Sequence, residues 1–294
     1  MKIKDINIKE VSNGDNVCAF FICKSFSVKF TRLGDEYIDC VLENKTGNIR
    51  GKVWSFVDDF KKRMSPHVPV AVKGSIINYN NDLEVNISSI NIVDTDIYKT
   101  YGYKEDLLIK TTSDNIKKLY SQLDEYLNTL KPDYKRIIKK IIKDNNKKFI
   151  SYPSIDKPYM LKGGLLKQIV TILHLHAKVY KQYKNINDDI VKAGIIIKNI
   201  GCLYYFNDDF QFSVSRQNKK VGCKLHGVNL INDYALSYSN FSHDIKTQLQ
   251  NIILSENSEN DININYINSI YTFDLSISPN VTNSLFSFGI SRPM

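Results

Sequence analysis

The chain of 294 residues is long enough for two domains that each bury a core. Its 40 lysines and arginines against 31 aspartates and glutamates give a formal charge of +9, which favours polyanionic partners, nucleic acid first and acidic protein surfaces second. It contains no apolar run of transmembrane length, and the N-terminal MKIKDINIKE lacks the apolar stretch of a signal peptide, so we expect a cytoplasmic protein without a membrane partner. The five cysteines are scattered and form no C-x-x-C pair, which disfavours a zinc knuckle or a disulfide framework.

Residues 1–94 are predicted to form a five-stranded β-barrel. Between residues 16 and 93, short apolar runs alternate with turn signals, and Leu83, Val85 and Ile87 share one face of the last run. Residues 45–47 and 80–82 have the composition of hairpin turns. The stretch VDDFKKRM after the third strand is predicted to be a short helix. Five strands with a helix after the third is the order of an OB-fold.

Cations interleaved with aromatic side chains indicate a strand-binding face on this barrel. OB-folds commonly bind single strands across strands two and three and the adjoining loops, where cations meet phosphates and flat rings stack on bases. The predicted nucleic-acid-binding residues are Lys29, Phe30, Arg32, Arg50, Lys52, Trp54 and Tyr79. The alternative is that Trp54 closes the end of the barrel and that the cations are ordinary solvated surface.

Residues 95–155 are predicted to connect two domains. A polar segment broken by Gly102 precedes a helix that Ser113 or Asp114 can cap. Pro132 is well placed to begin a second helix, in which pairs of isoleucines alternate with pairs of lysines. We expect those lysines to form a solvated face.

Residues 156–294 are predicted to be all helical, so the expected fold class is α+β multidomain, an OB-fold barrel followed by a helical domain. Residues 165–180 and 190–197 carry the apolar stripes of two buried helices, the second ending with Gly201 as its C-cap. Residues 206–222 are predicted to form a loop or short hairpin. Three further helices are expected within 225–236, 243–255 and 264–278, and the segment 278–294 is expected to be partly mobile.

Three strings in this arrangement resemble the YhaM-type 3′-to-5′ exoribonucleases over nearly the whole chain. They are KTGNIRGKVW at residues 45–54, GGLL at 163–166 and AGIIIKNIG at 193–201. The resemblance implies a nucleic-acid-binding OB domain joined to a helical domain of the HD type, in which histidines and aspartates hold divalent cations for phosphodiester hydrolysis. We therefore expect the helical domain to be HD-like.

The implied metal ligands are absent from the positions where the resemblance places them. A glutamate–histidine pair after GGLL is Lys167–Gln168 here, and the histidine–aspartate pair after AGII is Lys198–Asn199. The other implied positions fall near Pro158–Tyr159, on Gly227 beside His226, on Glu256–Asn257 and on Phe273 beside Asp274. An ammonium at position 198 would repel a dication by about 4 kcal/mol per unit charge at about 4 Å and an effective dielectric constant of about 20. We therefore predict no catalytic residues, no metal centre and no cofactor.

Three functions remain open from the sequence. The first is a non-catalytic protein that binds single-stranded RNA or DNA, in which Lys167 and Lys198 turn the old metal pocket into an anion site. The second is an active exoribonuclease with a relocated metal site. The third is a structural subunit, in a homo-oligomer or a larger complex, that uses both domains for protein contacts. Candidate ligands for a relocated metal are His174, His176, Asp208, Asp209, His226 and Asp274, although one step round a helix turns a side chain by about 100°.

Overall fold

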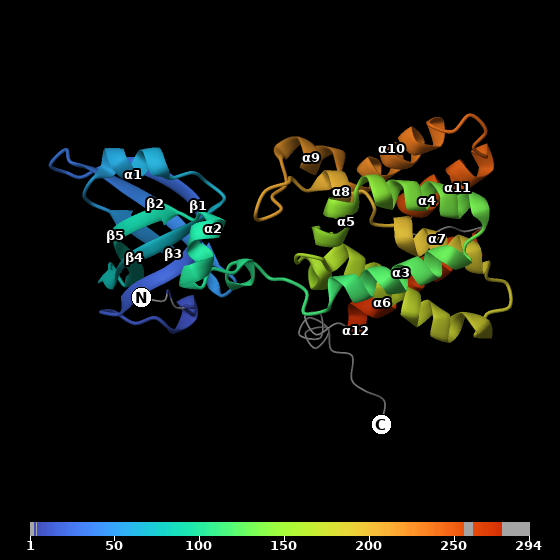
Figure 1. The fold of residues 1–294 in the computed structure, drawn as a ribbon, viewed down its shortest axis with the longest axis horizontal. Coiled ribbons are helices and arrows are strands. Elements are labelled where there is room, and N and C mark those ends of the chain that lie inside the picture. The colour runs from blue at the N-terminus through green and yellow to red at the C-terminus, as the bar shows by residue number, and fades with distance from the viewer. Residues whose placement is uncertain (1–2, 4, 256–260, 278–294) are drawn as a thin grey trace, which may run out of the picture. The chain divides into compact units, whose positions relative to one another are not determined.

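The computed structural model describes residues 3, 5–255 and 261–277, and the chain divides into two compact units. The first comprises residues 1–110 together with 209–211, and the second comprises the remainder. The first unit is built mainly of strands and the second of helices (Figure 1). No helix in the described ranges is long and apolar enough to cross a membrane.

Five strands of the first unit close into a barrel in the order β1-β2-β3-β5-β4. All neighbouring strands are antiparallel except β3 and β5, which are parallel. The strands are β1 (Asn16–Phe30), β2 (Glu36–Asn44), β3 (Gly47–Val53), β4 (Val68–Tyr79) and β5 (Asp82–Ile92). The helix α1 (Val57–Arg63) follows β3, as predicted. This order confirms the OB-fold barrel.

Alternating apolar side chains fill the barrel. On β1 these include Val17, Ala19 and Phe21, which pack against Ile38 of β2 and other core residues. Gly51 of β3 faces the same core, and a Cβ there would lie 2.6 Å from Ile87 Cδ1. The glycine therefore lets β3 approach the opposite wall, while its neighbours on β3 point outward.

Helices make up the second unit, which confirms the predicted fold class. Short elements flank the barrel and join the helices: η1 (Ile8–Glu10), α2 (Thr95–Tyr98), η2 (Lys99–Tyr101), η3 (Glu105–Leu107), η4 (Lys157–Tyr159) and η5 (Tyr180–Gln182). The helices of the second unit are α3 (Ile116–Thr129), α4 (Pro132–Asp144), α5 (Asn146–Ser151), α6 (Gly164–Val179), α7 (Asp188–Ile197), α8 (Cys202–Tyr205), α9 (Arg216–Val221), α10 (Cys223–Leu236), α11 (His243–Leu254) and α12 (Ile262–Ile277).

The two predicted central helices are α6 and α7. Asn187 caps α7, because its side chain accepts hydrogen bonds from the backbone N–H groups of Asp189 and Ile190. Most of α7 from Val191 onward is buried, and α6 buries Leu165, Leu166 and further residues on the same stripe. Both helices therefore lie in the core of this unit. The residues that follow GGLL and AGII are on or directly after these buried helices.

Two local predictions were wrong, and a third cannot be compared with the structure. Asn115, rather than Ser113 or Asp114, caps α3. The segment predicted as a loop or hairpin contains the short helix α9, whose start is capped by the Ser215 hydroxyl. The segment 278–294, expected to be partly mobile, lies outside the described residues.

The prediction for Gly201 was also wrong. Helix α7 ends at Ile197, and Gly201 has φ of −61°, so it is not a left-handed C-cap. A Cβ on Gly201 would lie 1.9 Å from the backbone oxygen of Cys223 and 2.7 Å from the backbone nitrogen of Gly227. Glycine is required here because the start of α10 passes against the backbone of this residue.

Replacing Gly201 by alanine should therefore destabilise the helical unit, because neither backbone can yield without moving a helix. We expect its free energy of unfolding to fall by about 3 kcal/mol, measured by urea unfolding followed by helical circular dichroism. Gly222→Ala is the matched control. Its Cβ would meet nothing within 4 Å, so only the backbone strain at φ of +81° and ψ of 153° applies, about 1–3 kcal/mol. Equal losses in the two variants would contradict the packing argument.

Candidate functional site

A stacked aromatic pair lies on the outside of the barrel. The rings of Tyr37 on β2 and Trp54 just after β3 have centroids 4.7 Å apart and planes inclined by 24°. Trp54 is 46% exposed and is not part of the barrel core. The indole therefore stacks beside the strands rather than closing the barrel end.

Lys52 is a buried structural cation. It is only 8% exposed, and its Nζ lies 2.6 Å from Glu84 Oε2. The same ammonium sits 4.0 Å from the ring centroid of Tyr79 and 5.8 Å from that of Trp54. Because a cation attracts the faces of nearby rings, Lys52 fixes the two aromatic side chains in place instead of reaching out to a phosphate.

Two other predicted cations share one acidic partner. Arg50 Nη2 lies 3.4 Å from Asp39 Oδ2, and Lys29 forms an ion pair with the same oxygen. Arg32, in the turn after β1, is exposed and makes no ion pair with any described residue. The charge of this face is therefore partly neutralised, and Arg32 is its most available cation.

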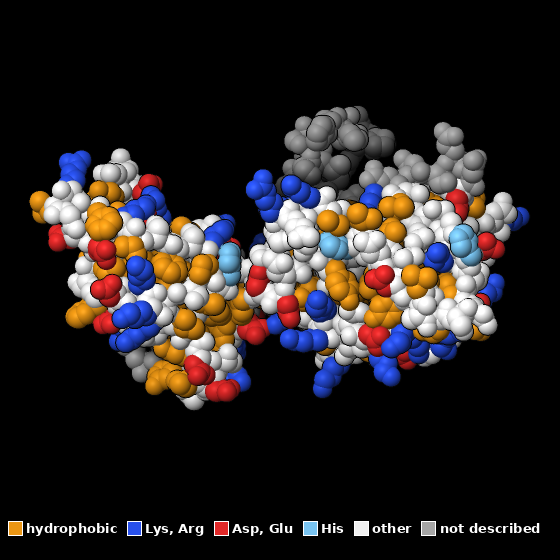
Figure 2. Space-filling view, turned by 90° about the horizontal axis from the view of Figure 1, so that it is seen from above, with side chains coloured by type: hydrophobic (Ala, Val, Ile, Leu, Met, Phe, Trp, Pro, Cys, Tyr) orange, Lys and Arg blue, Asp and Glu red, His pale blue; other side chains and the backbone are white. Residues whose placement is uncertain are grey.

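The exposed rings are the other part of this surface. Tyr79 is 53% exposed and Phe30 is 66% exposed. We call the set Phe30, Tyr37, Trp54 and Tyr79, with the cations Lys29, Arg32, Arg50 and Lys52, the aromatic face. Hydrophobic and cationic side chains lie next to one another on the surface seen in Figure 2. The arrangement suits the stacking of bases on flat rings, with charge close by for phosphates.

Sequence reasoning missed Tyr37, Asp39 and Glu84. Tyr37 and Asp39 alternate with the core residues of β2, so the period of two could have placed both on the outer side. Glu84 could not be found in this way, since its contact with Lys52 depends on the parallel pairing of β3 and β5.

In the helical unit, the residues at the implied metal positions form a hydrogen-bonded cluster. Gln168 of α6 is fully buried, and its Nε2 donates to Asp156 Oδ2 at 2.6 Å. Asn199 donates through Nδ2 to the same carboxylate oxygen at 2.8 Å and to Gln168 Oε1 at 3.0 Å. The hydroxyl of Ser154 donates to Gln168 Oε1 at 2.5 Å. We call these four residues the amide cluster.

A buried carboxylate lies at the position next to the predicted closing ligand. Phe273 is half exposed, whereas Asp274 is buried and accepts a hydrogen bond from the Tyr159 hydroxyl at 2.8 Å. Burial raises the pKa of Asp274, and the charge of Asp156 adds to this rise while the hydrogen bond from Tyr159 opposes it. The inward-facing residue of this turn of α12 is therefore Asp274.

The candidate ligands for a relocated metal do not gather. His176 is fully buried, with Nδ1 at 3.2 Å from the Tyr266 hydroxyl and Nε2 at 2.9 Å from Asp188. Burial lowers the pKa of His176, although Asp188 opposes this effect. His174 packs against the ring of Tyr126, Asp208 pairs with Lys147, and His226 is half buried with Nε2 unbonded. Within the described ranges, no group of three or more His, Cys, Asp or Glu side chains could hold a metal ion.

The two lysines predicted to form an anion site are not brought together. Lys198 Nζ lies 2.5 Å from Asn268 Oδ1 and lines a cavity of about 320 Å³ that it shares with Lys224. Lys167 lies elsewhere and pairs with Asp114 at 2.9 Å, and its hydrogen bond lowers the pKa of that carboxyl. The positions Glu256 and Asn257 lie outside the described residues.

The chain is similar in sequence to a known exoribonuclease. No family model matches the chain. The 3′-5′ exoribonuclease YhaM of Geobacillus sp. (strain WCH70) is 24% identical over 212 residues, which are 71% of this chain and 64% of that protein. The resemblance to the YhaM-type exoribonucleases is confirmed. The match spans less than two thirds of the length of this relative.

Two of the solved structures similar to this chain each match about a third of it. The second OB-fold domain of replication protein A from Methanococcus maripaludis matches 31% of this chain and 97% of its own length, with 18% identity and a TM-score of 0.26. A replication protein A heterotrimer bound to ssDNA matches 32% of this chain and 68% of its own, with 16% identity and a TM-score of 0.25.

The amide cluster yields a prediction with a defined pH dependence. Asn199→Asp replaces the NH₂ group that donates to Asp156 with a second carboxylate. We expect the helical unit to lose about 3 kcal/mol at neutral pH, since a buried donor is lost and like charges meet. The new carboxyl has a folded pKa above its unfolded value of about 3.9, so the deficit is present at neutral pH and disappears as the pH falls below about 4.

Urea unfolding of the variant and the parent chain at several pH values measures this effect. Asn268→Asp is the matched control, because the same substitution there places the carboxylate against the ammonium of Lys198 and should destabilise much less, its loss being the 3.4 Å hydrogen bond from Asn268 Nδ2 to the Ser255 backbone oxygen. An Asn199→Asp variant as stable as the parent chain at neutral pH would contradict the description of the cluster.

Proposed function

We propose that this chain binds single-stranded nucleic acid on the aromatic face of its barrel and that its helical unit does not hydrolyse the strand. The observation that carries the proposal is the exposed stack of Trp54 on Tyr37, with Tyr79 fixed nearby by Lys52. The sequence similarity to an exoribonuclease supports a nucleic-acid ligand. The formal charge of +9 favours the same class of partner.

Stacking dominates this proposed interaction. Each base stacked on an aromatic ring contributes about 1–3 kcal/mol, and the contribution tolerates any base sequence. The cations add less than their number suggests, because Lys52 is paired with Glu84, and Lys29 and Arg50 share Asp39. The proposed ligand is therefore an unpaired strand, whose bases are free to stack, rather than a duplex read through its phosphates.

The amide cluster supports the non-catalytic part of the proposal. Metal-assisted hydrolysis needs anionic or imidazole ligands around a cation, whereas Gln168 and Asn199 are neutral and use their NH₂ groups as donors to Asp156. The carboxylate of the cluster, Asp156, already accepts hydrogen bonds from both NH₂ groups at one oxygen, so a cation would have to displace these donors. The cavity lined by Lys198 and Lys224, and also by Asp156, is a proposed anion site. Lys167 is left out of it because it pairs with Asp114.

Trp54→Ala should weaken the binding of a short single strand by about 5- to 150-fold, the loss of one stacked base. Fluorescence anisotropy with labelled RNA and DNA of the same sequence measures it. Phe273→Ala is the control, because it removes a half-exposed ring from the helical unit. The logarithm of the affinity should fall with the logarithm of the salt concentration with a slope of about −1.4, for about two neutralised phosphates. Unchanged affinity in Trp54→Ala would refute the aromatic face as the binding site.

Incubation of the full chain with labelled single-stranded RNA and either Mn²⁺ or Mg²⁺ should leave the strand at full length, with or without a chelator. The reason is that the implied metal positions within the described residues carry no histidine or carboxylate. Gel electrophoresis measures the outcome. Chelator-sensitive shortening from the 3′ end would refute the non-catalytic proposal and favour a relocated metal site. Shortening that Trp54→Ala reduces in step with binding would assign the activity to this chain rather than to a contaminant.

A further inference from the structure

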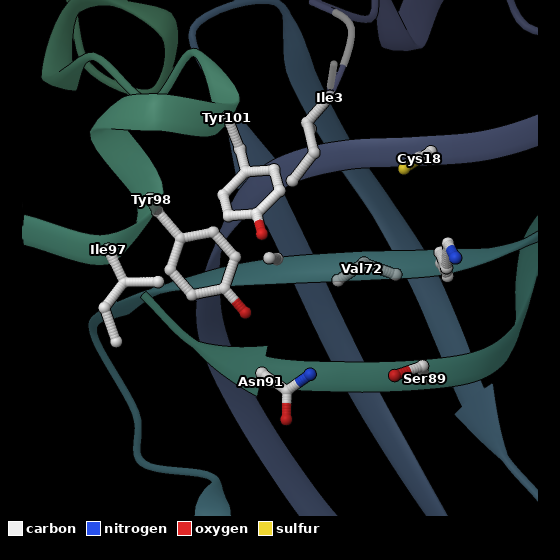
Figure 3. A pocket seen from close by; sticks show the side chains of 10 residues that line it. Ile3, Cys18, Val72, Ser89, Asn91, Ile97, Tyr98 and Tyr101 are labelled. Carbon is white, nitrogen blue, oxygen red and sulfur yellow. The ribbon is translucent and has the colours of Figure 1, made fainter. Parts of the chain in front are cut away.

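A second cavity lies on the barrel, on the outer side of β1, β4 and β5, next to α2 and η2 (Figure 3). Its volume is about 380 Å³, within the range of small-molecule sites. None of the residues that line it belongs to the aromatic face. The two surfaces can therefore be tested separately.

The register of the three strands builds the floor of this cavity. Cys18, Lys73 and Ser89 lie opposite one another in one row across β1, β4 and β5. Ala71 lies opposite Asn91 in the next row. Because the side chain of Ala71 is a single methyl group, it leaves space above the sheet for the cavity. Polar side chains of β4 and β5 surround this space.

Aromatic rings form one wall. Tyr98 of α2 and Tyr101 of η2 have ring centroids 5.9 Å apart, with planes inclined by 52°. Tyr98 is held by an edge contact with Phe20 of β1, at a centroid distance of 5.9 Å. Figure 3 shows the hydroxyl ends of Tyr98 and Tyr101 turned toward the strands that carry Val72 and Asn91. The rings are therefore anchored to the barrel and border the cavity.

The polar groups around the cavity are not engaged with one another. Within the part of the chain that the structure describes, the side chains of Lys73, Ser89, Asn91, Tyr98 and Tyr101 make no hydrogen bond or ion pair. Three hydroxyls, one amide and one ammonium therefore border the same cavity. Such a set binds a ligand that has a flat apolar body, a hydrogen-bonding edge and an anionic group.

We propose that this cavity binds an adenine nucleotide. The tyrosine rings offer a surface for the base, and the amide of Asn91 presents a donor beside an acceptor, the pattern that pairs with the adenine edge. Lys73, one row away on β4, supplies the charge for a phosphate. The nucleotide is either free or one residue of a strand that also contacts the aromatic face.

Isothermal titration of the full chain with AMP, GMP and adenosine tests the proposal. We expect AMP to bind at least about tenfold more tightly than GMP. Asn91→Ala should abolish this preference. Lys73→Gln should weaken the binding of AMP by about tenfold and leave the binding of adenosine unchanged. Circular dichroism of each variant verifies that the barrel is folded. Absence of AMP binding at millimolar concentration, or a preference that survives Asn91→Ala, would overturn the proposal.

Trp54→Ala separates this site from the proposed function, because it should leave AMP binding unchanged while weakening the strand. The source of the nucleotide is decided with an oligo(A) strand. If Asn91→Ala weakens the binding of oligo(A) as well as that of AMP, the nucleotide is part of the strand. If only the binding of AMP is weakened, the nucleotide is a free ligand. Loss of AMP binding in Trp54→Ala would overturn the assignment to this cavity.

Discussion

The helical unit depends on how the polar atoms between α6, α7 and the segment before them are satisfied. Gln168 is fully buried, and burying its amide without hydrogen-bond partners would destabilise the folded state. Asn199, Ser154 and Asp156 supply those partners. A half-satisfied polar network is less stable than either a complete one or an apolar core. A change at one residue of the cluster therefore leaves its partners unsatisfied. This fits the presence of amides at two of the implied ligand positions, 168 and 199, which bond to each other.

The same constraint limits the charge available on the barrel. Glu84 and Asp39 are buried carboxylates, and each requires a cation nearby. Lys52 forms an ion pair with Glu84, and Lys29 and Arg50 both pair with Asp39. The face thereby gains a rigid frame for its rings at the expense of phosphate-binding charge. The structural role of these cations and the proposed dominance of stacking both follow from this arrangement.

The elements could be predicted from the sequence much better than the contacts. Alternation and turn residues identify the strands of the barrel, and the apolar stripes identify α6 and α7, because both signals are local. Lys52 was predicted as a strand-binding cation, but its partner Glu84 is adjacent only through the parallel pairing of β3 and β5. Lys167 next to Gln168 points to Asp114 instead of Lys198, a direction set by the rotation of α6 in its packing. Predicting the cavity near Ala71 would require the register of β1, β4 and β5, which the sequence does not give.

The glycines in the strings that carry the resemblance have packing roles independent of catalysis. A Cβ on Gly164 would lie 1.9 Å from the backbone oxygen of Tyr159, and one on Gly194 would lie 2.4 Å from Ile267 Cδ1 of α12. Gly201 meets the start of α10 in the same way. Substitution at any of them separates helices that must touch, whatever chemistry the unit performs. The glycines of GGLL and AGIIIKNIG therefore identify the helical scaffold. They carry no information on hydrolysis, for which the resemblance implies ligands at other positions, 168 and 199 among them.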